Sequence, residues 1–178
     1  MEKLSSRTSP FNLEEHFMIK YQPVKDKRSS YFSLILLIGG LVIFMLSGSF
    51  KIAPFITQLI AIAMIVLSVQ IMQRYVLSEF TYILYDKDDG ESLLSVIRTQ
   101  GKKSVTVCSV SLNECIYAGN SEKFDMKLNN SFDYRQNVFE ESKFAIVYLD
   151  GSDNIMIKLE LDDYTRDCIA QRINNKEK

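Results

Sequence analysis

Few side chains in this sequence could carry out nucleophilic or metal chemistry. The cysteines are Cys108, Cys115 and Cys168, and His16 is the single histidine. No two cysteines form a Cys-x-x-Cys pair, whereas a zinc site needs about four such ligands at suitable spacing. His16 is far along the chain from all three cysteines, so a Cys–His nucleophile pair is not indicated. We therefore predict reduced thiols, no metal, no cofactor and no enzymatic activity.

Three cations could instead bind an anion. Arg98, Lys102 and Lys103 surround a turn at Gln100-Gly101, and such a cluster could contact lipid headgroups or another anionic ligand. The alternative is a solvated hairpin tip, whose lysines discourage strand pairing between molecules. From Glu79 onward the chain has 13 basic and 18 acidic residues, a net charge of −5. This balance opposes a strong anion site, and it predicts no nucleic-acid partner.

Two uncharged apolar runs, at about 31–50 and 52–73, lie before this acidic region. A bilayer core about 30 Å thick requires about 20 apolar residues in a helix, and both runs meet that length. We predict a transmembrane helical hairpin over 31–73 that contacts membrane lipids. A cleaved signal peptide would need a shorter apolar run and a cleavage site. A core hairpin of a soluble protein would need a larger shell than this chain has.

The cations beside the two runs predict the orientation of the hairpin. Basic residues are retained on the cytoplasmic side of a membrane. Only Lys51 lies in the short link, which predicts that the link is outside and that both termini are cytoplasmic in a cell membrane. The cations on the predicted cytoplasmic side are Lys20, Lys25, Lys27, Arg28 and Arg74.

Small residues recur at regular spacing within the two runs. A stripe of small side chains lets helix backbones approach closely in lipid. Packing of the two spans on each other is the favoured interpretation, and a contact between copies of the chain is the alternative, so the oligomeric state stays open. No charged side chain lies inside either run, which argues against an ion or proton pathway. The stripes consist of Ser33, Gly40 and Ser47 in the first run, and Ala53, Thr57 and Ala61 in the second.

The remainder of the chain changes to short apolar runs separated by turn residues, which is typical of strands. Residues 119–130 are polar and predict a loop, and Asp150-Gly-Ser-Asp153 predicts a hairpin turn. In the last run Ile155, Ile157, Leu159 and Leu161 alternate with Met156, Lys158 and Glu160, so we expect the first set to face the core and the second to face solvent. The seven predicted strands are 79–85, 93–99, 104–110, 114–118, 132–139, 143–149 and 154–160.

A helix is predicted after the last strand. Asp162 or Asp163 can accept hydrogen bonds from the first turn as an N-cap. The side chains expected on its buried face are Tyr164, Cys168, Ile169 and Ile173.

The order of these elements resembles the pleckstrin-homology-like (PH-like) barrel, in which a four-stranded and a three-stranded sheet pack together and a C-terminal helix closes one end. The chain is also similar to small bacterial membrane proteins of uncharacterised function. The shared features are two N-terminal spans, a first strand with Phe80-Thr-Tyr82, a turn with Gly101-Lys-Lys103 and an acidic helix cap. The resemblance implies an α+β membrane protein with a PH-like cytoplasmic domain at 79–173.

The predicted organisation is a cytoplasmic tail at 1–30, the transmembrane hairpin, the PH-like domain and a polar tail at 174–178. The tail at 1–30 could form a short interfacial helix or a flexible leader. We expect the domain to fold without the spans. The leading hypothesis is a non-enzymatic module that binds a protein partner or organises a complex at the inner face of the membrane. The alternatives are a sensor of anionic lipid or ligand, and a membrane enzyme without a recognisable site.

Overall fold

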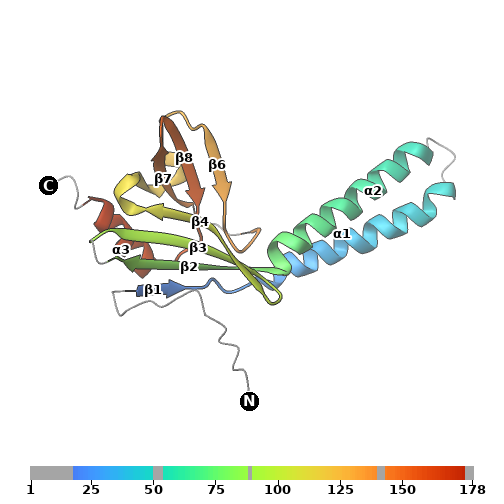
Figure 1. Ribbon diagram of the computed structural model, residues 1–178. Coiled ribbons are helices and arrows are strands. Elements are labelled where there is room, and N and C mark those ends of the chain that lie inside the picture. Colours follow the sequence, from blue (N-terminus) through green and yellow to red (C-terminus); the bar gives the residue numbers. More distant parts are fainter. Residues whose placement is uncertain (1–17, 50–53, 88–89, 140–142, 175–178) are drawn as a thin grey trace, which may run out of the picture.

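The computed structural model describes residues 18–49, 54–87, 90–139 and 143–174. Two long helices, α1 (Lys27–Leu46) and α2 (Pro54–Ile71), form an antiparallel pair that projects away from a β-rich body (Figure 1). Asp26 caps α1 by accepting a hydrogen bond from the Arg28 backbone N–H. A π-helical segment, η2 (Met72–Val76), extends α2 toward the body. Both helices are long and apolar enough to cross a membrane.

The first sheet contains a strand that the sequence did not predict. This strand, β1 (Met18–Tyr21), precedes the helices and pairs antiparallel with β2 (Ser78–Asp86), which follows them. Within the predicted tail at 1–30, the described residues 18–30 contain a strand and the start of α1. They do not form an interfacial helix or a flexible leader. Residues 1–17, including His16, lie outside the described residues. The strand order is β1-β2-β3-β4, with β3 (Ser92–Gln100) and β4 (Lys103–Ser111).

The helical hairpin is therefore an insertion between two neighbouring strands of one sheet. Tyr21 pairs with Tyr82 at the end of β1, and the chain then leaves the sheet, forms both helices and returns as β2. Both covalent connections between the hairpin and the β-rich body start from adjacent strands. Two connections restrict rotation of the body about the helices more than a single linker would.

The second sheet has the order β5-β7-β8-β6. Its antiparallel part agrees with the predicted strands and with the predicted turn, where Asp150 pairs with Asp153 and Gly151 has φ +63°. The strand predicted at 132–139 is much shorter, and it runs parallel to β8. Eight strands are thus described, where seven were predicted. The strands of this sheet are β5 (Cys115–Asn120), β6 (Asn130–Asp133), β7 (Phe144–Asp150) and β8 (Asp153–Lys158).

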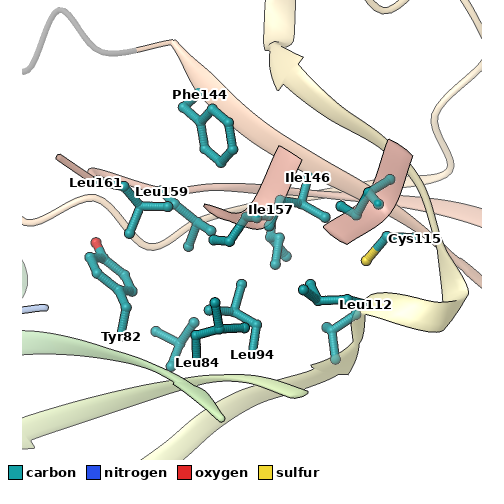
Figure 2. Close-up of a cluster of buried hydrophobic side chains, with 14 of the residues drawn as sticks. Tyr82, Leu84, Leu94, Leu112, Cys115, Phe144, Ile146, Ile157, Leu159 and Leu161 are labelled. Carbon is teal, nitrogen blue, oxygen red and sulfur yellow. The ribbon is translucent and has the colours of Figure 1, made fainter. Parts of the chain in front are cut away.

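A single apolar core fills the space between the sheets (Figure 2). Tyr82 and Leu84 of β2 face Ile157 of β8 and Leu159 across it, which confirms the inward face predicted for these last two. Burying each such side chain stabilises the fold by about 1.5–3 kcal/mol. The other buried core members are Phe80, Leu94, Val96, Val110, Leu112, Cys115, Phe144, Ile146, Leu161, Ile169 and Ile173.

The C-terminal helix, α3 (Asp163–Asn174), packs against this core through Ile169 and Ile173. Asp162 accepts a hydrogen bond from the Thr165 N–H at 3.2 Å, as predicted for a cap. Tyr164 was wrongly placed on the buried face, because its side chain is 62% exposed and Thr165 is buried instead.

The outer face of the second sheet is covered rather than solvated. Phe124 and Leu128, from the segment predicted as a polar loop, pack against Met156 of β8 and against two residues of β7. Met156 is therefore buried, and Glu160 is buried against Gln136 and Asn137, both contrary to the solvent-facing prediction. The period-two pattern identifies the strand, but it cannot reveal a distant segment that covers the second face.

A bulge changes the face that β4 presents. Val96 pairs with Cys108 and Ile97 pairs with Thr106, which leaves Val107 as the extra residue. Val107 and Cys108 both pack toward the core, and Val105 is exposed. β4 therefore does not keep one alternation of inward and outward side chains along its length.

Candidate functional site

The two helices contact each other through small residues, three of which the sequence analysis singled out. Ser33, Gly40 and Ala61 are buried between α1 and α2. A Cβ on Gly40 would lie 2.8 Å from Ile65 Cγ1 and 3.1 Å from the carbonyl oxygen of Ala61. Ser68, which the sequence analysis missed, donates a hydrogen bond to the Ser33 carbonyl oxygen at 2.6 Å.

The other residues of the predicted stripes lie less centrally. Ser47, the C-cap residue of α1, is buried and donates to the Phe44 carbonyl oxygen of that helix. Thr57 is half-buried, and Ala53 lies outside the described residues.

Replacing Gly40 with alanine should destabilise the helical hairpin by about 1–3 kcal/mol, because the new methyl group would overlap atoms of α2. The neighbouring change, Gly39→Ala, is the matched control, since its Cβ would meet only the flexible end of Met64 at 3.3 Å. Thermal melts of the detergent-solubilised full-length variants measure both effects. Equal melting temperatures for the two variants would contradict the close packing at Gly40.

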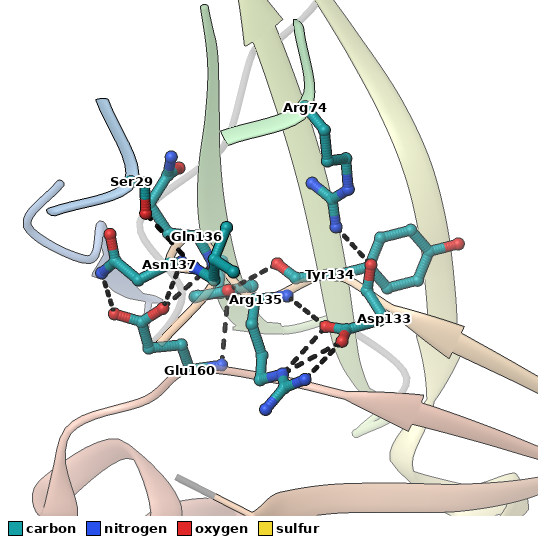
Figure 3. Close-up of polar contacts among 10 residues, drawn as sticks. Ser29, Arg74, Asp133, Tyr134, Arg135, Gln136, Asn137 and Glu160 are labelled. Atoms are coloured by element: carbon teal, nitrogen blue, oxygen red, sulfur yellow. Dashed lines mark hydrogen bonds and ion pairs between the residues drawn. The ribbon is translucent and has the colours of Figure 1, made fainter. Parts of the chain in front are cut away.

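A buried polar network joins the helical hairpin to the barrel, the β-rich body formed by the two sheets and α3 (Figure 3). Glu160 follows β8 and is buried, with 8% of the residue exposed. Its Oε2 accepts hydrogen bonds from the backbone N–H groups of Gln136 and Asn137, both at 3.0 Å. Its Oε1 accepts from Asn137 Nδ2 at 2.7 Å. The backbone N–H groups of this segment therefore bond to a carboxylate instead of a neighbouring strand. This explains why the strand predicted at 132–139 ends early.

Asn137 extends the network to the chain that enters α1. Its side-chain amide donates to the Val24 carbonyl oxygen at 2.9 Å, and its Oδ1 accepts from the Asp26 N–H at 2.6 Å. Phe139, two residues after Asn137, contacts α1 itself. Its ring meets the Phe32 ring edge-on, with centroids 5.6 Å apart. Asn137 thus ties the barrel to the start of α1.

Gln136 makes the corresponding link to the chain that leaves α2. Its side chain is almost fully buried, and its Oε1 accepts from the Phe80 N–H at 2.8 Å. Its Nε2 donates to the carbonyl oxygens of Tyr75 at 3.1 Å and Ser78 at 3.0 Å. All three partners lie at the end of η2 or the start of β2, so Gln136 fixes β2 where it leaves the helix.

Charged groups complete the junction. Arg74 of η2 lies over the Phe80 ring, 4.3 Å from its centroid, and donates to the Asp133 carbonyl oxygen. Burial would raise the pKa of the Asp133 carboxyl, but hydrogen bonds and charge from Arg135 outweigh it and hold the pKa below its usual range. On the other side, Lys25 Nζ donates to the Val76 carbonyl oxygen at 2.8 Å and pairs with Glu79 at 3.0 Å.

A family model described as Bacterial PH-like domain (DUF6106) matches residues 17–178. The chain belongs to this family. No curated protein and no solved structure matches it. The matched range includes β1, both apolar helices and the barrel, which agrees with the hairpin being an insertion within the PH-like domain and not a separate N-terminal unit.

In this PH-like domain the three predicted anion-binding cations differ in exposure and partners. Arg98 is half-buried, and its Nε donates to Ser78 Oγ at 3.0 Å. Lys102 and Lys103 are exposed at the β3–β4 turn, which Gly101 allows by adopting φ +61°. A hollow of about 520 Å³ separates this turn from the helical base; Lys25, Val76, Leu77 and Gln100 are among its lining residues.

A second hollow of about 390 Å³ lies on the first sheet, on the face away from the core. Its floor is apolar where Ile83 and Ile97 lie, and Lys20 provides a charge at the β1 side. At the opposite side it reaches β4, which is an edge strand among the described strands. The remaining lining residues are Thr81, Thr99, Ser104 and Thr106.

The cysteines of the domain lie in structural positions. Cys115 is buried in the core, and its Sγ donates to the Ser111 carbonyl oxygen at 3.4 Å. Burial raises the pKa of the half-buried Cys108 thiol, which disfavours the nucleophilic thiolate. Cys168 packs at the margin of the core. Within the described ranges no three His, Cys, Asp or Glu side chains group as a metal site would require.

Proposed function

We propose that the chain is an integral membrane protein in which α1 and α2 cross the bilayer and both termini are cytoplasmic. Helices of this length reach about 30 Å, the thickness of the hydrocarbon core. Their outward side chains are apolar and well exposed; Ile35 is 68% exposed and Met45 is 83% exposed. Such a surface needs a lipid or protein covering. The cations beside the barrel, Lys25, Lys27 and Arg28, support the cytoplasmic orientation.

We further propose that this PH-like domain is a non-enzymatic module that holds a protein partner at the inner face of the membrane. The observation that carries this proposal is the double attachment of the barrel. Two covalent connections and the buried contacts of Gln136, Asn137 and Glu160 hold the barrel in one orientation on the hairpin. A fixed orientation is useful for presenting a binding surface and unnecessary for a tether alone.

The geometry of Glu160, a buried carboxylate at the junction, favours a structural role. Both of its oxygens accept hydrogen bonds from amide groups of the segment that it supports. A general base must instead present an oxygen to a substrate. This arrangement assigns Glu160 to holding the 136–137 segment in the proposed module.

The hollow beside β4 is the surface best suited to a protein partner. The backbone of an edge strand can pair with an extended peptide, while a neighbouring groove receives alternate side chains of that peptide. Ser104, Val105 and Thr106 of β4 are exposed. We propose that an extended segment of the partner adds to β4 and places apolar side chains over Ile97.

Site-specific photocrosslinking in native membranes tests this function. A photoreactive residue at Thr106 should give a discrete crosslinked protein band, because Thr106 lines the hollow beside β4. The same residue at Ser152, an exposed position in the β7–β8 turn, is the control and should give none. Crosslinking to a protein from Ser152 but not Thr106, or from neither position, would contradict partner binding at β4.

A further inference from the structure

The β3–β4 turn lies at the level where the helical hairpin meets the barrel. Gln100, the last residue of β3, pairs with Ser78, the first residue of β2. The apolar span formed by α2 and η2 extends as far as Val76, only two residues before Ser78. The turn residues Gly101 and Lys102 extend beyond that strand pair, and Figure 1 shows the turn beside the base of the helices.

Four exposed cations lie around this level of the molecule. Lys102 and Lys103 occupy the turn, and the first turn of α1 adds Lys27 and Arg28. Leu77, between α2 and β2, is half exposed and lines the hollow that separates the helical base from the turn. The acidic residue in that hollow, Glu79, is paired with Lys25 at 3.0 Å. Asp26 likewise pairs with Arg28 at 3.8 Å, so Lys27, Lys102 and Lys103 leave the local surface positive although the barrel as a whole is acidic.

Local charge decides binding at a membrane because salt screens distant charges. The Debye length is about 8 Å at physiological ionic strength, so acidic residues at the far end of the barrel contribute little at the turn. The net charge of −5 opposes lipid binding by a free domain in solution. In the intact chain the helices hold the turn at the membrane, where effective concentration no longer limits the contact.

We propose that Lys102 and Lys103 bind the headgroups of anionic phospholipids in the same leaflet that the helical base occupies. This inference rests on the proposed membrane crossing and deepens it, because the turn becomes a lateral support for the barrel. The lipid is recognised through charge and position, so a diacyl phospholipid with a net negative headgroup suffices. The contact adds a third point of attachment beside the two covalent connections.

A single-tryptophan experiment tests the proposal in the full-length protein, since the sequence contains no tryptophan. Gln100→Trp reports on the β3–β4 turn without removing a cation, and Ser152→Trp reports on the β7–β8 turn, which lies on the opposite side of the body (Figure 1). The protein is reconstituted into vesicles of phosphatidylcholine alone or of equal parts phosphatidylcholine and phosphatidylglycerol. Both vesicle types contain a phosphatidylcholine with a nitroxide on its headgroup.

The expected result is stronger quenching of Gln100→Trp in the phosphatidylglycerol vesicles than in phosphatidylcholine alone, and no quenching of Ser152→Trp. Adding Lys102→Ala and Lys103→Ala should abolish the difference between the two lipid mixtures. The matched pair Lys123→Ala and Lys127→Ala removes the same charge from exposed positions between β5 and β6 and should preserve the difference. Equal quenching in both mixtures, or a difference unaffected by removing Lys102 and Lys103, would overturn the proposal.

A second reporter separates failure of the lipid contact from failure of the membrane crossing. Leu41→Trp, at an exposed position within α1, should be quenched by lipids brominated deep in their acyl chains in both mixtures. Quenching of Leu41→Trp without quenching of Gln100→Trp would leave the spans in place and refute the lipid contact. Absence of both signals would refute the membrane crossing itself.

Discussion

A fragment of residues 79–178 should lack a stable cooperative melt, whereas a fragment that joins 18–24 to 75–178 through a short Gly-Ser linker should melt cooperatively. The first fragment lacks β1, whose Ile19 and Tyr21 pack against the core. The Tyr21 ring stacks on that of Tyr82, with centroids 6.3 Å apart. The sequence predicted a self-sufficient domain at 79–173, and the position of β1 before the helices changes that expectation.

The size of the effect follows from the burial lost. Removing two partly buried apolar side chains costs up to about 3 kcal/mol each, and domains of this size are stable by only about 5–15 kcal/mol. Without β1, β2 becomes an edge strand with unpaired backbone groups. The loss should therefore leave the shorter fragment marginal at room temperature.

Circular dichroism melts and urea titrations of the two fragments provide the measurement. The control is Ile19→Asp in the linked fragment, which places a charge against the core and should lower its stability toward that of the shorter fragment. If 79–178 melts at the same temperature as the linked fragment, then β1 contributes nothing to the barrel.

The elements that could be predicted from the sequence are those with a local signal. The uncharged runs at 31–50 and 52–73 have the length of helices that span a membrane, and the α-helices of the structure cover most of both runs. Period-two alternation located most strands of the barrel within about two residues. The Asp162 cap and the turn at Asp150-Gly-Ser-Asp153 were also visible, because each depends on residue types at fixed short spacing.

The features that escaped prediction depend on partners that are distant in sequence. β1 has four residues, and its partner strand follows both helices in the sequence, as the pairing of Met18 with Tyr85 shows. No local pattern therefore marks β1 as a strand. Gln136 and Glu160 look like ordinary surface polar residues until the fold brings them together at 3.0 Å. The partner of Arg98 escaped prediction for the same reason, since its Nε donates to Ser78 Oγ on the neighbouring strand.

Replacing Glu160 with alanine should produce the largest loss of stability of any single change at the junction. The carboxylate accepts three hydrogen bonds from Gln136 and Asn137, and the buried backbone N–H groups of both residues would lose their acceptor. Each unsatisfied buried donor costs about 1–3 kcal/mol, so the total should exceed about 3 kcal/mol. Because the same segment binds Tyr75 and Val24, the barrel should also loosen from the helices.

Two measurements on the full-length protein distinguish loosening from general unfolding. The melting temperature in detergent reports the loss of stability, and hydrogen exchange at residues 134–139 reports local release of the segment. Glu160→Gln keeps one acceptor oxygen and should fall between wild type and alanine. Glu114→Ala removes an exposed carboxylate and should change the melting temperature little. Unaltered exchange at 134–139 in Glu160→Ala would show that Glu160 does not hold the barrel on the hairpin.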